Sequence, residues 1–202
     1  MTNEELIQGL KNDGVLKTKA IEEAFRAVDR ARFAGEDSRP VAYMDTALPI
    51  GEGQTISQPT VVALCLEWLS VRPGDRVLDV GSGSGWTTAL LAHLVGLVGS
   101  VIGVERIPEL VAFGSKNLGA YAFLQAHIEQ AGPELGKPEA APFDRILVSA
   151  SAEEIPDALK QQLKDGGRMV ISVRDALCVV DRADGQFTTV RHEGFAFVPL
   201  IT

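Results

Sequence analysis

A glycine-rich turn next to acidic side chains is the part of the sequence best suited to chemistry. An apolar run at 77–80 (VLDV) leads directly into GSGSG at 81–85. Glycine at a turn from strand to helix lets the backbone approach a ligand closely. Dinucleotide-binding loops read G-x-G-x-x-G, whereas here Trp86 takes the place of the last glycine. The spacing therefore disfavours a nicotinamide-dependent dehydrogenase.

Two carboxylates narrow the type of ligand. Asp79, just before the turn, can accept hydrogen bonds from an ammonium group, and a negative charge there would repel a pyrophosphate. Glu105 ends the next β-rich run, where an acidic side chain can accept both hydrogen bonds of a ribose diol. Together they favour a nucleoside cofactor with a cationic amino-acid end, as in S-adenosylmethionine. The alternative is an ordinary glycine turn with a surface glutamate.

Strands and helices alternate around this turn. The predicted strands are 76–81, 100–105, 143–149 and 167–173, and the predicted helices are 86–94, 108–118 and about 159–163. Strands linked by helical crossovers predict an α/β fold, a doubly wound, mostly parallel sheet with helices on both faces. Runs at 177–183 and 186–192 flank Asp184-Gly185, a hairpin signal, and a last strand is predicted at 193–201. We therefore expect an antiparallel C-terminal edge.

The N-terminal part predicts a helical extension. Thr2 and Glu5 form a Thr-x-x-Glu capping box ahead of a short helix, and apolar spacing predicts a second helix over 21–28. The stretch 34–58 is rich in turn-forming residues and is expected to be irregular, either functional or disordered. A third helix should begin at Pro59 and end near Leu69. We expect one domain over 1–202, with a substrate region at 1–58 and a cofactor-binding core at 59–202.

Composition limits the partners and the compartment. With 202 residues, 46% of them hydrophobic, the chain can bury one core. Its 19 basic and 27 acidic residues give a net charge of −8, so no global positive field draws it to nucleic acid or anionic membrane. No apolar run approaches the roughly 20 residues that span a bilayer. We expect a cytoplasmic monomer in which Cys65 and Cys178 are buried, reduced thiols.

Several further segments resemble one family. They are 42–45 (AYMD), 48–51 (LPIG), 53–59 (GQTISQP), 81–86 (GSGSGW), 104–110 (VERIPEL), 141–150 (APFDRILVSA), 155–170 (IPDALKQQLKDGGRMV) and 197–200 (FVPL). In this order they resemble the protein-L-isoaspartate O-methyltransferases over nearly the whole chain, and GQTISQP is the most distinctive. The resemblance implies a class I, Rossmann-like methyltransferase fold. It also implies S-adenosylmethionine as cofactor, S-adenosylhomocysteine as product, and isoaspartyl-containing proteins and peptides as substrates.

The resemblance also assigns roles to residues. The active-site residue is Ser57, which precedes the helix at Pro59, so its hydroxyl and nearby N–H groups can hold a carboxylate at the positive end of the helix dipole. An isoaspartyl residue offers such a group in its free α-carboxylate. The plainer alternative for Ser57 is a helix N-cap. The predicted substrate-binding residues are Thr55, Ile56, Gln58, Val198 and Leu200, although Val198 and Leu200 could equally belong to a buried edge strand. The predicted cofactor-binding residues are Asp79, Gly81, Ser82, Gly83, Ser84, Gly85, Glu105, Arg106 and Gly132.

The implied reaction requires few catalytic groups. An α-carboxyl group has a pKa of about 3.5, so the acceptor is already ionised near pH 7 and no general base is required. The three histidines, His93, His127 and His192, follow no triad or metal-ligand spacing, and we expect no metal. In the family, the methyl ester collapses to a succinimide whose hydrolysis returns part of the material to aspartate.

The sequence departs from the family at three places. Gly132 stands where the family has an aspartate near the adenine ring, and Pro133 replaces the following glycine. The family's Pro-Arg is Asp29-Arg30 here, and a glycine appears as Arg174. Loss of one charge-assisted hydrogen bond would weaken cofactor binding by about 1.5–3 kcal/mol, unless Glu129 or Glu134 substitutes. Two alternatives follow, a methyltransferase for another carboxylate acceptor and a degenerate, non-catalytic cofactor-binding module.

Overall fold

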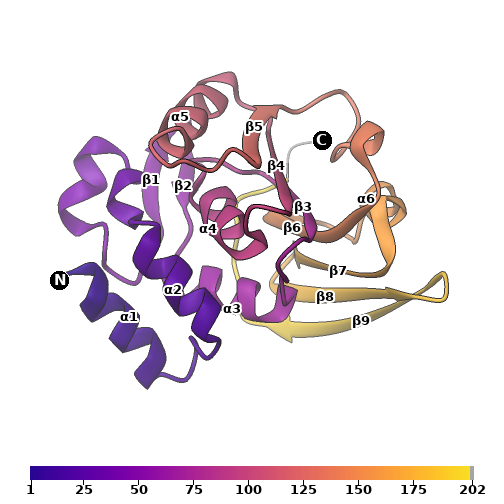
Figure 1. The fold of residues 1–202 in the computed structure, drawn as a ribbon, viewed down its shortest axis with the longest axis horizontal. Coiled ribbons are helices and arrows are strands. Elements are labelled where there is room, and N and C mark those ends of the chain that lie inside the picture. The colour runs from indigo at the N-terminus through magenta and orange to yellow at the C-terminus, as the bar shows by residue number, and fades with distance from the viewer. Residues whose placement is uncertain (201–202) are drawn as a thin grey trace.

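The computed structural model describes residues 1–200 and contains two sheets (Figure 1). The helices are α1 (Asn3–Asn12), α2 (Lys19–Ala27), α3 (Pro59–Leu69), α4 (Trp86–Val95), α5 (Pro108–Leu118) and α6 (Asp157–Gln162), with 3-10 helices η1 (Arg30–Arg32), η2 (Glu36–Val41) and η3 (Pro138–Ala140). The strands are β1 (Leu48–Gly51), β2 (Gln54–Ile56), β3 (Arg76–Val80), β4 (Ser100–Glu105), β5 (Ala126–Gln130), β6 (Phe143–Ala152), β7 (Leu163–Val173), β8 (Ala176–Ala183) and β9 (Gln186–Glu193).

The main sheet has seven strands in the order β5-β4-β3-β6-β7-β8-β9. The first five strands of the sheet, β5, β4, β3, β6 and β7, are parallel to one another, and β8 and β9 add an antiparallel edge. At the tip of the edge hairpin, Asp184 and Gly185 adopt φ angles of 52° and 73°, which a tight two-residue turn requires. The predicted doubly wound sheet with an antiparallel C-terminal edge is confirmed.

Alternating side chains give the sheet two apolar faces. In β3, Val77 packs into a cluster with residues of α1 to α5, whereas Leu78 and Val80 pack into a second cluster with Leu159 of α6. This alternation follows from the period of two residues in a strand. Helices therefore cover both faces, as predicted, but unequally, because the second face is covered by one short helix and by apolar side chains of the 131–141 segment.

The N-terminal helices pack beside α4, on the side of the molecule opposite the β8–β9 hairpin (Figure 1). The predicted capping box is present, because Glu5 N donates to Thr2 Oγ1 at 3.2 Å and Thr2 N donates to Glu5 Oε2 at 2.7 Å. Phe25 of α2 meets Trp86 of α4 edge-on, with ring centroids 5.5 Å apart. This contact joins the extension to the first turn after the glycine loop.

The prediction that segment 34–58 is irregular needs correction. It contains η2 and an antiparallel hairpin of β1 and β2, in which Leu48 pairs with Ile56. The hairpin turns at Gly51, Glu52 and Gly53, all with positive φ angles. Leu48 and Ile56 are buried, so the segment is held by the core rather than disordered.

The predicted final strand is also wrong. Residues 194–200 form one isolated parallel bridge, in which Ser151 N donates to Val198 O and Leu200 N donates to Ser151 O, both at 2.8 Å. The register of β6 against β7 shifts just before Ser151, so no ladder continues there. The predicted end at Ile201 lies outside the described residues.

The sequence analysis missed one strand and misplaced the start of another. β5 was not among the strands predicted from periodicity, because it is an edge strand in which only Ile128 is buried. β7 begins at Leu163, directly after α6, rather than at Gly167. Within residues 1–200, no helix combines the length and apolar composition needed to cross a bilayer.

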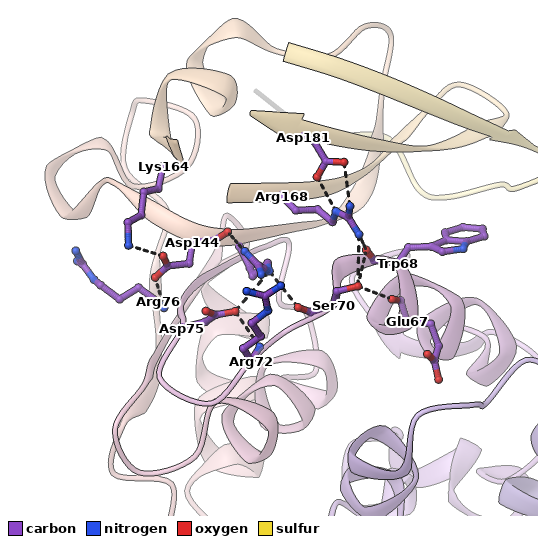
Figure 2. A network of polar contacts seen from close by, with 11 residues as sticks. Glu67, Trp68, Ser70, Arg72, Asp75, Arg76, Asp144, Lys164, Arg168 and Asp181 are labelled. Carbon is purple, nitrogen blue, oxygen red and sulfur yellow. Dashed lines mark hydrogen bonds and ion pairs between the residues drawn. The ribbon is translucent and has the colours of Figure 1, made fainter. Parts of the chain in front are cut away.

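A polar network closes the C-terminal end of α3 against the starts of the sheet strands (Figure 2). Arg168 donates to Trp68 O at 3.0 Å and forms two hydrogen bonds to Asp181, at 2.6 and 2.9 Å. Arg145 donates to Ser70 O at 3.3 Å and lies 3.4 Å from Asp75. Arginines near a helix C-terminus satisfy its last carbonyls and oppose the helix dipole. The network fixes α3 on the sheet.

Candidate functional site

A cleft opens at the C-terminal ends of β3, β4 and β6. Its volume is about 890 Å³ including the open mouth, and it is bounded by the glycine loop, the end of β4, the 131–136 segment and the C-terminal segment. The crossover connections from β3 and β6 leave the sheet here in opposite directions along the strand order. Such a switch point is where doubly wound sheets bind ligands.

The glycine loop forms one wall of the cleft. Gly83 has a φ angle of 51° and faces the cleft, and a Cβ there would lie 3.4 Å from Ile50 Cδ1. Gly85 has a φ angle of 84°, and a Cβ there would lie 2.9 Å from Gly114 O in α5. The loop therefore needs glycine at Gly83, where it faces the cleft, and at Gly85, where it packs against α5.

Glu105 lies at the end of β4 with its carboxylate in the cleft wall. Its Oε2 accepts from Gly83 N at 2.9 Å, and its Oε1 accepts from Ile107 N at 3.0 Å. Each carboxylate oxygen has a second lone pair, so both can still accept from a ligand diol. The backbone contacts fix the carboxylate next to the glycine loop.

Asp79 is fully buried and does not line the cleft. Its Oδ2 accepts from the hydroxyls of Thr87 and Thr88, each at 2.7 Å, while Oδ1 has no hydrogen-bond partner. Burial, with Glu105 as a lesser cause, raises the pKa of Asp79 to about 6. The structure thus places Asp79 behind the first turn of α4, so its predicted contact with a ligand ammonium group stays a prediction.

The N-terminus of α3 carries Ser57, and another residue supplies its cap. Asp45 accepts from Thr60 N at 2.8 Å and from the Thr60 hydroxyl at 2.7 Å. Within residues 1–200, no protein group hydrogen-bonds the Ser57 hydroxyl, which removes the interpretation of Ser57 as a side-chain N-cap. At this helix end Asp45 occupies the Thr60 N–H group, and the predicted contact of Ser57 with a ligand carboxylate stays a prediction.

Ser57 lies where two clefts meet. A second cleft, of about 750 Å³, is bounded by residues of β2, the start of α3 and the 196–198 segment, including Ser57, Gln58 and Val198. A small pocket between them, called the passage below, is lined by Ser57, Ile56 and the glycine-loop residues Gly81 to Ser84 and shares lining residues with both clefts. Gly132, Arg106 and Leu200 line the first cleft. The structure therefore brings together all predicted site residues except Asp79, which is buried behind α4, and Gly85, the loop residue that packs against α5.

Ser149 belongs to the site and was missed in the sequence. With Thr55, it lines the first cleft, the passage and the second cleft. It lies near the end of β6, next to β3 in the sheet. The rule that ligands bind beyond the carboxyl ends of neighbouring parallel strands would have indicated it.

The altered loop forms the far wall of the first cleft. Ala131 to Gly136 line it, and a Cβ at Gly132 would meet no atom within 4 Å. Of the two proposed substitutes, Glu134 lines the cleft, whereas Glu129 pairs with Lys137 at 2.5 Å. Only Glu134 is placed to reach a ligand in this cleft.

The cysteines and histidines lie apart from the clefts. Cys65 and Cys178 are free and buried, and burial raises the pKa of Cys65 to about 12. His192 stacks on Trp68, with ring centroids 4.0 Å apart. In the described part of the chain, no three His, Cys, Asp or Glu side chains gather in a metal-binding arrangement.

Comparison with known proteins gives consistent matches. The family model described as protein-L-isoaspartate(D-aspartate) O-methyltransferase matches residues 1–202. A Methanopyrus kandleri protein-L-isoaspartate O-methyltransferase is 46% identical and covers 98% of this chain and 90% of its own length. One from Pyrococcus horikoshii is 41% identical and covers 96% and 90%. A Plasmodium falciparum crystal structure of a protein so described, in complex with S-adenosyl-L-homocysteine, superposes with a TM-score of 0.91 at 30% identity, covering 100% and 99%.

Proposed function

The chain belongs to the protein-L-isoaspartate(D-aspartate) O-methyltransferase family, and from this premise we propose how its two clefts divide the reaction. It is a methyltransferase that uses S-adenosylmethionine. The first cleft would hold this cofactor, with the ribose on Glu105 and the purine toward 131–136. The second cleft would hold an isoaspartyl residue of a damaged protein or peptide.

The observation that carries this proposal is the position of Ser57. Its hydroxyl has no protein partner within residues 1–200, and it lines both the passage and the second cleft. A hydroxyl can donate one hydrogen bond to a carboxylate. The negative charge of the carboxylate makes this bond shorter and stronger than a bond between neutral groups. Thr55 and Ser149 add hydroxyl groups along the same path. The acceptor carboxylate would therefore meet the methyl donor in the passage.

Positioning supplies the catalysis in this proposal. When bound, S-adenosylmethionine supplies an electrophilic methyl group, and the products are a methyl ester and S-adenosylhomocysteine. The acceptor is already ionised near neutral pH, so no residue of the chain has to remove a proton. Ser57 would orient one carboxylate oxygen, the glycine loop would fix the donor, and the narrow passage would limit water.

The C-terminal segment would select the acceptor. Val198 lines both clefts, and its carbonyl is bound by Ser151 N. Phe197 and Ala196 add apolar surface to the second cleft. An extended peptide carries its isoaspartyl α-carboxylate on a side branch of the backbone, so a cleft beside an extended segment suits it. The substrate region at 1–58 and the cofactor core at 59–202 are part of this proposal.

Matched peptides test the proposal. Purified protein would be incubated with labelled S-adenosylmethionine and with peptides that differ only in having isoaspartate or aspartate at one position. Transfer to the isoaspartyl peptide, released as methanol on mild alkali treatment, is the expected result. Equal transfer to both peptides would indicate another carboxylate acceptor, and cofactor binding without transfer would indicate a non-catalytic module. Light scattering and cell fractionation would test the proposed monomeric state and cytoplasmic location.

A further inference from the structure

Arg30 is a fully buried arginine beside the candidate acceptor site. Among residues 1–200, its terminal nitrogens donate to four backbone carbonyls and to no carboxylate. Nη2 donates to Ser57 O at 3.0 Å and to Thr46 O at 2.9 Å, and Nη1 donates to Met44 O at 3.3 Å and to Ala42 O. A guanidinium has four terminal N–H groups, so this fork is fully used.

The four carbonyls belong to two segments that are distant in sequence. Three lie at 42–46, the segment that carries Asp45, and the fourth is that of Ser57 at the start of α3. Asp45 caps α3 through Thr60. Arg30 and Asp45 therefore both join the 42–46 segment to the start of α3, Arg30 through the Ser57 carbonyl and Asp45 through Thr60.

Arg30 also reaches the cofactor side of the site. Its guanidinium lies 5.2 Å from the centre of the Trp86 ring, and Trp86 is the first residue of α4, directly after the glycine loop. Trp86 and Ser57 both line the passage. The Arg30 side chain thus contacts the 42–46 segment, Ser57 at the start of α3, and Trp86 directly after the glycine loop.

This burial is costly. Desolvation lowers the pKa of Arg30 to about 10, opposed by the charge of Asp45. The group remains charged near neutral pH, and its Nε has no partner. Burying a charge that has no carboxylate partner is unfavourable, so a purely space-filling role would be served better by an apolar side chain.

We infer that Arg30 is a positioning residue for methyl transfer, fixing the Ser57 carbonyl and the 42–46 segment so that the Ser57 hydroxyl faces the passage. This inference rests on the proposed function. It assigns to Arg30 no contact with substrate or cofactor. Its effect on the reaction passes through the placement of Ser57 and Trp86.

The test compares Arg30→Gln and Arg30→Lys with Arg145→Gln. Arg145 is a matched control, because it is also buried and also donates to backbone carbonyls, but at the opposite end of α3. Both glutamine variants should lower the melting temperature. Only Arg30→Gln should lower kcat per folded molecule, by about 100-fold, because a misplacement of about 1 Å costs that much. Its affinity for S-adenosylhomocysteine should change by less than about threefold, because none of the residues that Arg30 contacts lines the first cleft.

Two further readouts separate positioning from folding. Added guanidinium or ethylguanidinium should restore part of the turnover of an Arg30→Ala variant and should leave the turnover of an Arg145→Ala variant unchanged. Arg30→Lys should recover only part of the loss, because an ammonium lacks the planar fork. Equal losses of turnover in the Arg30 and Arg145 variants, or unchanged kcat in Arg30→Gln, would overturn the inference.

Hydrogen exchange keeps the inference testable without an acceptor. In Arg30→Gln, amides at 42–46 and 57–61 should exchange faster than in the wild type, whereas in Arg145→Gln they should not. If the wild type fails to methylate isoaspartyl peptides, the proposed function fails. Unchanged exchange in Arg30→Gln would refute the positioning role itself, whatever the acceptor.

Discussion

At its C-terminal end, helix α3 is closed by arginines that are paired with carboxylates, whereas at its N-terminal end the Ser57 hydroxyl has no partner within residues 1–200 and Ser57 lines the passage and the second cleft. Arg168 and Arg145 bind the last carbonyls of α3 and are balanced by Asp181 and Asp75 (Figure 2). At the other end, Arg30 binds carbonyls only, and the Ser57 hydroxyl has no partner within residues 1–200. The same helix is thus anchored at one end and left with unused hydrogen-bonding capacity at the other.

The C-terminal end of α3 therefore contributes to stability, and its N-terminal end contributes to function. A satisfied polar network stabilises but cannot bind a ligand without breaking its own contacts. An unpartnered hydroxyl at a cleft contributes little stability and retains its capacity to bind. Substitutions at the anchored end should therefore change the free energy of unfolding, and those at the cleft end should change turnover or affinity.

The largest effect is expected from Arg145→Gln. Removing one partner of a buried ion pair leaves Asp75 without its arginine and should lower the free energy of unfolding by about 3–5 kcal/mol. Denaturant unfolding followed by circular dichroism measures it. Turnover per folded molecule should stay unchanged, and a large loss of turnover would contradict the separation between the two ends of α3.

Asp79→Asn should change the pH dependence of stability. The pKa of Asp79 is about 6 in the folded protein, above its ordinary value of 3.8, so the folded state binds more protons between these values. Wild-type stability from this group is therefore present at low pH and is lost as pH rises through about 6. The variant lacks this loss, so between pH 4 and pH 7 its free energy of unfolding should gain up to about 3 kcal/mol relative to the wild type.

Cofactor affinity tests the second role of Asp79. If its carboxylate attracts the ammonium group of S-adenosylmethionine, wild-type affinity should fall as pH drops below about 6, and the variant should bind more weakly with no such dependence. Calorimetry at pH 5 and pH 8 measures both. Identical affinities for the wild type and the variant at pH 8 would leave Asp79 with a structural role on Thr87 and Thr88 alone.

Ser57→Ala should lower kcat/KM for an isoaspartyl peptide by about ten- to a hundredfold, equivalent to about 1.5–3 kcal/mol for one hydrogen bond to a charged group. Affinity for S-adenosylhomocysteine and the melting temperature should change little, because Ser57 caps no helix. The matched control is Ser70→Ala at the other end of α3, where the hydroxyl donates to Glu67 O at 3.0 Å. That variant should lose stability and keep its activity.

The smallest effect is expected from Gly132→Asp, which restores the acidic residue of the family. A Cβ fits there without contact, and Gly132 does not have a positive φ angle. A recovered hydrogen bond should tighten S-adenosylhomocysteine binding by about 1.5 kcal/mol, roughly tenfold. Gly9→Asp, another open glycine position far from the cleft, controls for the added charge. Weaker binding in Gly132→Asp would show that this loop recognises the purine differently.

Sequence patterns were sufficient where a local rule acts alone. The capping box at Thr2, the glycine turn after β3 and the Asp184-Gly185 hairpin follow from side-chain hydrogen bonding and positive φ angles. They failed where contacts with residues distant in the sequence determine the local structure. The β1–β2 hairpin was predicted as irregular because its strands are short, and its burial depends on distant core residues. β5 has only one buried residue and so lacks an apolar pattern.

The sequence by itself determined the parallel core of the sheet with its antiparallel hairpin and the cofactor class, since the glycine loop and Glu105 follow from residue types and spacing, whereas Ser57 was indicated by the family resemblance of GQTISQP. Only the tertiary structure decided how those residues are used. In the structure, Asp79 lies behind the first turn of α4, and Asp45 caps α3. Ser149 lines the site, and Arg30 donates to the carbonyl of Ser57. These are contacts between segments far apart in the chain, and spacing along a sequence carries no information about which carbonyl a buried arginine will meet.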